Sequence, residues 1–194
     1  MDPSLSVEGR AKLLEVARAS ITCGLRSGRC LAVQPADYEP ELLAPGASFV
    51  TLRLAGALRG CIGNLTAERP LVLDVAHNAF AAAFSDPRFE RLSVGEFACV
   101  RISISLLSEP EPIDCSCEAE LLARLLPGRD GLILEAGSQR ATFLPAVWTE
   151  LPEPAFFWTA LKRKAGLSED AWPAGLCVQR YSAFVFEETA SATK

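Results

Sequence analysis

Arg59 and Cys61 are the residues whose types and spacing first suggest chemistry in this chain. They lie in the stretch LRGCIG, Leu58–Gly63, which has the length of a strand although it holds two glycines. On an unbulged strand, residues two apart share a face, so the guanidinium and the thiol would point the same way. A nearby guanidinium stabilises a thiolate, and glycine lets a backbone or a ligand approach closely. This pattern predicts that Cys61 is a nucleophile or redox thiol and that Arg59 binds an anion or holds the thiolate.

A structural Cys61 is the competing interpretation, because free cysteine often packs as a small apolar side chain. The cross-strand neighbour of Cys61 depends on the hairpin turn predicted near Ala55–Gly56. A two-residue turn pairs Cys61 with Val50, and a three-residue turn pairs it with Thr51. A bulge at Gly60 would break the alternation of faces. The sequence leaves these registers open.

His77 is the single histidine of the chain and the third candidate catalytic residue. On the helix predicted around it, Asp74, His77 and Asn78 form part of one polar stripe. If this stripe faces the hairpin, Asp74 would orient His77 as the base for Cys61. If it faces solvent, His77 has no special role, and this is the interpretation that we favour.

The composition restricts the remaining functions. The chain has 194 residues, 49% of them hydrophobic, with a net charge of −5, and the acidic balance argues against a nucleic-acid partner. No apolar run reaches the ~18 residues of a membrane span and no secretion signal is visible, so we expect no membrane partner and a cytoplasmic location. The seven cysteines are then expected to be thiols. One histidine and a single C-x-C, Cys115 to Cys117, predict no metal site, and the absence of a phosphate-loop motif predicts no bound cofactor.

Hydrophobic periodicity predicts alternating helices and strands in mixed order. The predicted helices are SLSVEGRAKLLEVARASITCGL with Ser6 as N-cap, RPLVLDVAHNAFAAAFSD, EAELLARLL and PAFFWTALKRKAGL, whose basic run Lys162–Lys164 is expected to be solvated. The predicted strands are the two of the hairpin, FACVRISISLL, GLILEA, RATFLPAVW and a single last strand LCVQRYSAFVFEE. Without regular βαβ units, this order indicates an α+β fold with a largely antiparallel sheet flanked by helices.

The stretch DPRF, Asp86–Phe89, is predicted to be structural. Pro87 ends the preceding helix, because the residue before a proline avoids helical geometry. We expect Asp86 to cap or turn the chain, Arg88 to bind a carboxylate or carbonyl groups, and Phe89 to anchor in the core.

Four stretches in order, LRGCIG, AAAFSDPRF, ATFLPAVW and LKRKAGL, make the chain resemble the AMMECR-domain family. The resemblance runs from about Val7 to Glu187, and LRGCIG is the family hallmark. The bacterial branch of the family is known as AmmeMemoRadiSam system protein A. The resemblance implies that residues 1–194 form one AMMECR-like domain. It would have a larger and a smaller lobe, with a cleft that Leu58–Gly63 lines.

The resemblance also implies partners, since the family is named beside a Memo-type protein and a radical-SAM protein that would share a modification pathway. The family has no established biochemical activity. Two functions therefore compete: a protein that docks onto one of these partners, and a cysteine-dependent enzyme that uses Cys61 with Arg59 in the cleft. The incomplete set of acid, base and nucleophile favours the docking protein, which should show an inert Cys61 and an exposed apolar patch.

Overall fold

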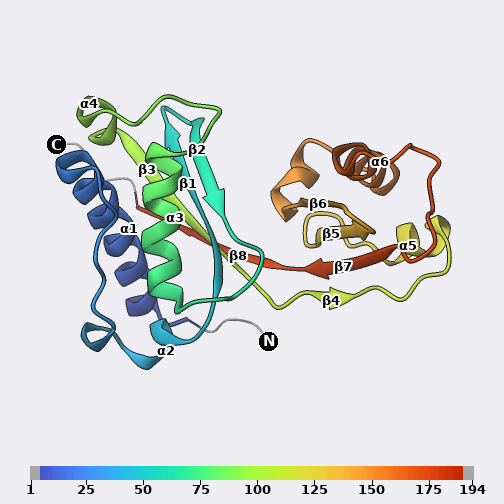
Figure 1. Ribbon diagram of the computed structural model, residues 1–194, viewed down its shortest axis with the longest axis horizontal. Helices are drawn as coiled ribbons and strands as arrows, with labels where there is room; N and C mark the ends of the chain where they lie inside the picture. The colour runs from blue at the N-terminus through green and yellow to red at the C-terminus, as the bar shows by residue number, and fades with distance from the viewer. Residues whose placement is uncertain (1–4, 190–194) are drawn as a thin grey trace. The chain divides into compact units, whose positions relative to one another are not determined.

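The computed structural model describes residues 5–189 of the chain (Figure 1). The chain divides into two compact units: a larger unit with the residues up to Leu107 and those from Phe184, and a smaller unit, Ser108–Ala183. Each unit combines helices with a four-stranded sheet, which confirms the predicted α+β class. Within residues 5–189, no helix has both the length and the apolar character that crossing a membrane requires.

The larger unit has the strand order β2-β1-β3-β8, so β2 is an edge strand. Its strands are β1 (Ala47–Leu54), β2 (Ala57–Gly63), β3 (Val100–Leu107) and β8 (Ala183–Glu187), and β1 runs antiparallel to β2 and β3. The helices α1 (Val7–Ser27) and α3 (Leu71–Phe84) pack together on one face of this sheet (Figure 1). Shorter elements are η1 (Pro35–Asp37), α2 (Pro40–Leu43) and α4 (Val94–Phe97).

Local signals explain the boundaries and faces of these elements. Ser6 caps α1, as predicted, because its Oγ accepts the N–H of Gly9 at 2.9 Å, and α1 ends at Gly28 in the left-handed conformation with φ 70°. The alternation predicted in β3 is confirmed: Val100, Ile102, Ile104 and Leu106 are all buried. These side chains form the core of the larger unit together with the apolar faces of α1 and α3.

The smaller unit has the strand order β4-β7-β5-β6. Its elements are β4 (Glu111–Pro112), α5 (Glu118–Arg124), β5 (Gly131–Ala136), β6 (Gln139–Phe143), η2 (Pro145–Thr149), α6 (Pro154–Ala165) and β7 (Cys177–Tyr181). Two predictions were wrong here. The predicted last strand is two strands, β7 and β8, which belong to different sheets, and the second half of RATFLPAVW is the 3₁₀ helix η2.

The expectation of a solvated helix end at Lys162–Lys164 was also wrong for Lys162. Its side chain is fully buried, and its Nζ donates to Glu118 Oε2 at 2.7 Å and to the carbonyl of Glu169. Lys162 lies four residues after Trp158 on the buried face of α6, and its Nζ is 5.8 Å from the centre of the Trp158 ring. Helical spacing places a residue at that position in the core whatever its charge.

Candidate functional site

The hairpin that carries Cys61 combines a tight turn with a bulge. Ala55–Gly56 form a two-residue turn with φ of 50° and 83°, the geometry that matches the twist of the flanking strands. The register then shifts by one residue, because Arg59 is an extra residue in β2 opposite β1. Cys61 therefore pairs with Thr51 and not with Val50. The two-residue turn is one of the predicted alternatives. The pairing of Cys61 with Thr51 is the one that had been predicted for a three-residue turn.

Cys61 is half-buried and is held through its thiol and through its peptide groups. The hydroxyl of Thr51 donates to Cys61 Sγ at 3.3 Å. The backbone N–H of Cys61 donates to Asp86 Oδ2 at 2.9 Å, and Arg88 Nη2 donates to the carbonyl of Cys61 at 3.2 Å. Two side chains from the segment after α3 thus bind both peptide groups of the residue that carries the thiol.

Asp86 and Arg88 form an ion pair at 2.8 Å directly after the end of α3. The hydrogen bond from the Arg88 side chain is the largest cause that holds the pKa of Asp86 well below its usual range, and the N–H groups of Cys61 and Arg88 add to it against the effect of burial. The prediction that Arg88 binds a carboxylate is confirmed.

Phe89 is only half-buried and lies outside the core clusters. The guanidiniums of Arg59 and Arg88 are 5.9 and 5.5 Å from its ring centre. Its predicted place in the core was wrong.

Arg59 binds a carboxylate on α4. Its Nε donates to Glu96 Oε1 at 2.7 Å and its Nη2 donates to Glu96 Oε2 at 3.2 Å. Glu96 also accepts from the N–H and hydroxyl of Ser93, which completes the capping box of α4. The hydrogen bond from Arg59 is the largest cause that lowers the pKa of Glu96 to about 2. The bulge at Arg59 removes the premise that Arg59 and Cys61 share a face, and a catalytic role for Arg59 stays a prediction.

His77 lies exposed on α3, apart from the hydrogen bonds of the site. Asp74, its expected orienting partner, is buried and accepts hydrogen bonds from Ser48, Asn64 and Asn78. Among residues 5–189, no hydrogen bond joins His77 to Asp74 or to Cys61. The structure therefore brings Thr51, and not His77, to the thiol.

The two glycines of β2 allow close packing and do not supply unusual backbone angles. A Cβ on Gly60 would overlap the carbonyl oxygen of Ala82 on α3, and a Cβ on Gly63 would overlap Phe49 and the carbonyl oxygen of Ser48. Neither glycine has a positive φ. The glycines bring β2 against its neighbours, and the space that they leave is filled by the protein itself.

Sequence reasoning missed Glu96 as the partner of Arg59. It also missed that Asp86 and Arg88 bind the peptide groups of Cys61. Glu96 had a signal: SVGE, Ser93–Glu96, matches the capping-box pattern, in which the glutamate turns toward the helix start. The contacts of Asp86 and Arg88 had none, because they join segments 25 and 27 residues apart.

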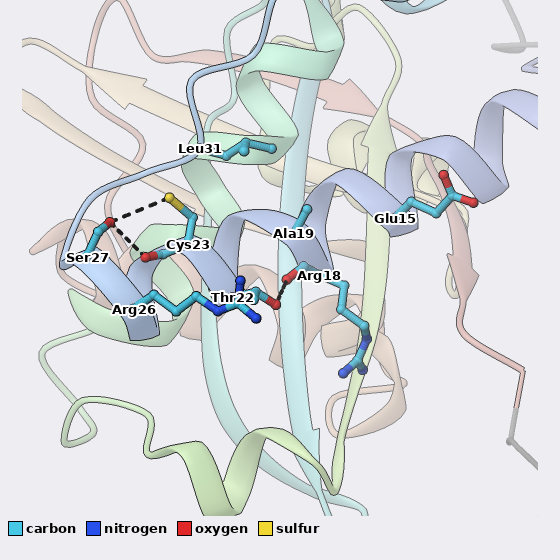
Figure 2. Close-up of a pocket in the computed structure, with 8 residues that line it drawn as sticks. All are labelled: Glu15, Arg18, Ala19, Thr22, Cys23, Arg26, Ser27 and Leu31. Carbon is cyan, nitrogen blue, oxygen red and sulfur yellow. Dashed lines mark hydrogen bonds between the residues drawn. The ribbon is translucent and has the colours of Figure 1, made fainter.

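Two surface hollows flank α1, and the candidate residues line neither of them. The pocket drawn in Figure 2 is lined by Glu15, Arg18, Ala19, Thr22, Cys23, Arg26, Ser27 and Leu31. The second hollow lies between α1, the start of β3 and the end of β8. In residues 5–189, no three His, Cys, Asp or Glu side chains are grouped to hold a metal ion.

Comparisons with known proteins identify the family. The AMMECR1 family model matches residues 14–186. The chain belongs to the AMMECR1 family. It is 37% identical over 197 residues to a protein of Thermofilum pendens, covering 95% of this chain and 92% of that one. It is 35% identical to a protein of Methanothermobacter thermautotrophicus, covering 93% and 94%.

A solved structure has the same fold. The crystal structure of the uncharacterized protein PH0010 from Pyrococcus horikoshii matches with a TM-score of 0.86 and 33% sequence identity. The match covers 95% of this chain and 93% of that one. The family and the α+β fold are therefore established together.

Proposed function

We propose that this AMMECR1-family chain acts with a Memo-type and a radical-SAM protein in a modification pathway, and that the surface around Leu58–Gly63 makes the contact. The state of the charged groups at the site supports this proposal. Arg59 is paired with Glu96 and Asp86 with Arg88, so these charges already have partners within the chain. In the part of the chain that the structure describes, the Cys61 thiol is hydrogen-bonded by the Thr51 hydroxyl and by no carboxylate or imidazole, and nucleophilic catalysis by a thiol needs a base or an equivalent. A second protein would supply the missing groups.

Exposed apolar side chains give this surface the character of a contact site. Leu58 on β2 is 38% exposed and Val94 on α4 is 71% exposed. The ion pair between Arg59 and Glu96 links β2 to α4. Leu58 and Val94 therefore lie on two elements that this ion pair connects. Exposed apolar side chains rimmed by polar residues are typical of protein interaction sites.

A capture experiment with charge insertions tests the proposal. The Memo-type and radical-SAM proteins of the same genome are immobilised in turn and offered the wild-type chain, Leu58→Asp, Val94→Asp or Val7→Asp. We expect both substitutions near the hallmark strand to weaken capture, because a carboxylate would be desolvated in the interface without a counter-charge. Val7 on α1 is 66% exposed and provides the matched control, whose capture should match wild type. Undiminished capture of Leu58→Asp and Val94→Asp would contradict the proposed surface.

A cysteine-dependent enzyme is the second candidate. The hydrogen bond from Thr51 to Cys61 Sγ favours it, because a hydroxyl donor interacts more strongly with a charged sulfur than with a neutral one. This function would use Cys61 with Arg59 in the predicted cleft, and His77 would have to reach it by a rearrangement. Turnover by the isolated chain that disappears in Cys61→Ala and persists in Cys99→Ala would favour the enzyme over the docking protein.

A further inference from the structure

The strand β8 forms the second edge of the sheet in the larger unit, beside β3. Hydrogen bonds at both ends fix the register of these two strands. At one end the N–H of Ser108 donates to the carbonyl of Ser182 at 3.0 Å. At the other end the N–H of Glu188 donates to the carbonyl of Ile102 at 3.0 Å. The same number of residues separates the two contacts on each strand, so the pair is antiparallel and contains no bulge.

The peptide groups of β8 therefore divide into two sets. Those of Phe184 and Phe186 face β3, because inward and outward peptide groups alternate along a strand. Those of Ala183, Val185 and Glu187 face away from the sheet, and among residues 5–189 no hydrogen bond from another segment reaches them. An edge with unpaired N–H and C=O groups is a template for one more strand.

This edge lacks the features that usually protect an edge strand from pairing. Ala183–Glu187 contains no lysine, proline or bulge, and Glu187 at its end is its single charged residue. Val185 is 58% exposed although it is apolar and β-branched. The opposite edge, β2, is bound by the side chains of Asp86 and Arg88. The sheet thus has one edge that its own chain closes in part and one that is open along its length.

The sequence AFVFE of β8 is complementary to a second copy of itself. An antiparallel pair centred on Val185 gives every residue of the strand a partner: Val185 meets Val185, Phe184 meets Phe186, and Ala183 meets Glu187. Each outward peptide group then meets an outward peptide group of the second copy, and such residues exchange two hydrogen bonds. The two Glu187 carboxylates lie about 14 Å apart along the strand, which exceeds the ~8 Å over which physiological salt screens exposed charges.

The side chains of this pair are apolar on both faces near its centre. Phe184 and Phe186 lie on the face that α1 covers, because Arg10 of α1 lies over the Phe184 ring at 5.5 Å and Phe186 packs against the core. Pairing places Phe184 beside Phe186 of the second copy, and the two Val185 side chains meet on the other face. Aromatic and β-branched cross-strand pairs are among those that stabilise antiparallel sheets.

We propose that β8 pairs with β8 of a second copy of this chain, in antiparallel register about Val185, and joins the four-stranded sheets of two larger units into one continuous sheet. A strand of this length buries less than the ~1,200 Å² of a stable interface, so the dimer is weak and depends on protein concentration. The contact uses β8 and not the surface around Leu58–Gly63, so it does not depend on the partner contact proposed above.

Sedimentation of the isolated full-length chain over a series of concentrations tests the association. We expect wild type to shift from monomer toward dimer as its concentration rises toward the millimolar range. Val185→Lys should lower the association constant about tenfold or more, because two ammonium groups would meet at the centre of the pair. Val94→Lys adds the same charge at a 71% exposed position on α4 and should associate like wild type. Thermal melts establish that both variants are folded.

Cysteine cross-linking tests the register with milder substitutions. Val185→Cys places two thiols at directly opposite positions, where Cα atoms are ~5.5 Å apart and a disulfide can form. Ala183→Cys is the matched control on the same strand and face, and it would lie about 14 Å from its copy along the strand. Under mild oxidation we expect several-fold more linked dimer from Val185→Cys than from Ala183→Cys or wild type, which contain the native exposed cysteines. Mass spectrometry assigns the link to position 185.

A monomer at every concentration would overturn the proposal. A dimer that Val185→Lys leaves intact would overturn it too, because another surface would then hold the two copies. Equal cross-linking of Val185→Cys and Ala183→Cys would overturn the register. Binding of a Memo-type protein that Val185→Lys abolishes, in a chain that does not associate with itself, would assign the edge to that partner and overturn the second copy as its occupant.

Discussion

The carboxylate of Asp86 accepts the backbone N–H of Cys61 at 2.9 Å, across 25 residues of sequence. The carbonyl of Cys61 is bound from the same segment by Arg88, at 3.2 Å. Cys61 lies on β2, an edge strand of its sheet, where outward peptide groups are free to recruit another strand. The ion pair of Asp86 and Arg88 thus closes the sheet edge at the residue that carries the thiol.

Replacing Asp86 should destabilise the protein more than replacing an exposed aspartate. Asp86→Asn keeps the shape of the side chain but removes the charge that Arg88 and two backbone N–H groups bind. We expect a loss of ~1–3 kcal/mol in the free energy of unfolding, measured by urea denaturation at pH 7. Asp37→Asn, at an exposed position of the larger unit, is the control and should change this quantity little. Equal losses would mean that the edge contact is not stabilising.

Stability should fall in acid because of Asp86 and Glu96. Both groups have a pKa that is lowered in the folded protein, Glu96 to about 2. The unfolded chain binds protons first, near the ordinary values of ~4, so the stabilisation is complete above that pH and is lost as the pH falls below it. Urea denaturation between pH 6 and pH 2.5 measures the slope. The Asp86→Asn variant should show a shallower decline, and an identical slope would exclude Asp86 as a source.

The glycines of β2 should tolerate a side chain worse than Cys61 tolerates the loss of its sulfur. Gly60→Val and Gly63→Val place carbon atoms on the carbonyl oxygens of Ala82 and Ser48, so we expect each to lose ~1–3 kcal/mol or more in stability. Cys61→Ala removes a single half-buried sulfur and should lose less. Gly95, whose added Cβ would meet open space, provides the control as Gly95→Ala. Thermal melts compare the four variants, and similar melting temperatures throughout would contradict the packing argument.

Sequence patterns predicted the elements whose causes are local. The alternation in β3 and the Ser6 cap of α1 depend on residues a few positions apart, and both were predicted correctly. The split of the predicted last strand at Ser182 was not predictable in this way. Ser182 exchanges hydrogen bonds with Ser108, 74 residues earlier, where the chain enters the smaller unit. Apolar alternation continues through that point and does not report the change of sheet.

Sequence reasoning did not predict how the candidate residues are paired. LRGCIG was predicted to be part of a strand and forms most of β2, and its glycines proved to be sites of close approach. The single-residue bulge at Arg59 then sent the guanidinium to Glu96, 37 residues away, so the pairing deduced from parity failed. Strand parity is reversed by one inserted residue, and the bulge that the sequence left open at Gly60 occurs one residue earlier, at Arg59.

The pair of Arg59 and Glu96 should couple β2 to α4 in a measurable way. In a double-mutant cycle with Arg59→Met and Glu96→Gln, we expect a coupling energy of ~1 kcal/mol, since the pair is bidentate and partly buried. Ser93→Ala should lose ~1 kcal/mol by removing the cap of α4. The cycle is measured by urea denaturation. A coupling energy of zero would show that water can take the place of each partner with no loss in the free energy of unfolding.

Lys162 should behave as a core residue of the smaller unit. Its stem is fully buried beside Trp158, and its ammonium is bound by Glu118. Lys162→Ala leaves a cavity where the buried stem was, so we expect a loss of ~3 kcal/mol in the free energy of unfolding. Lys162→Met keeps the apolar stem and should lose less. Arg163 is the neighbouring control: its side chain is 70% exposed in a pair with Glu169, and Arg163→Ala should change stability by no more than ~1 kcal/mol. Equal losses for Lys162→Ala and Arg163→Ala, measured by urea denaturation, would contradict the buried position of Lys162 and restore the solvated helix end expected from the sequence.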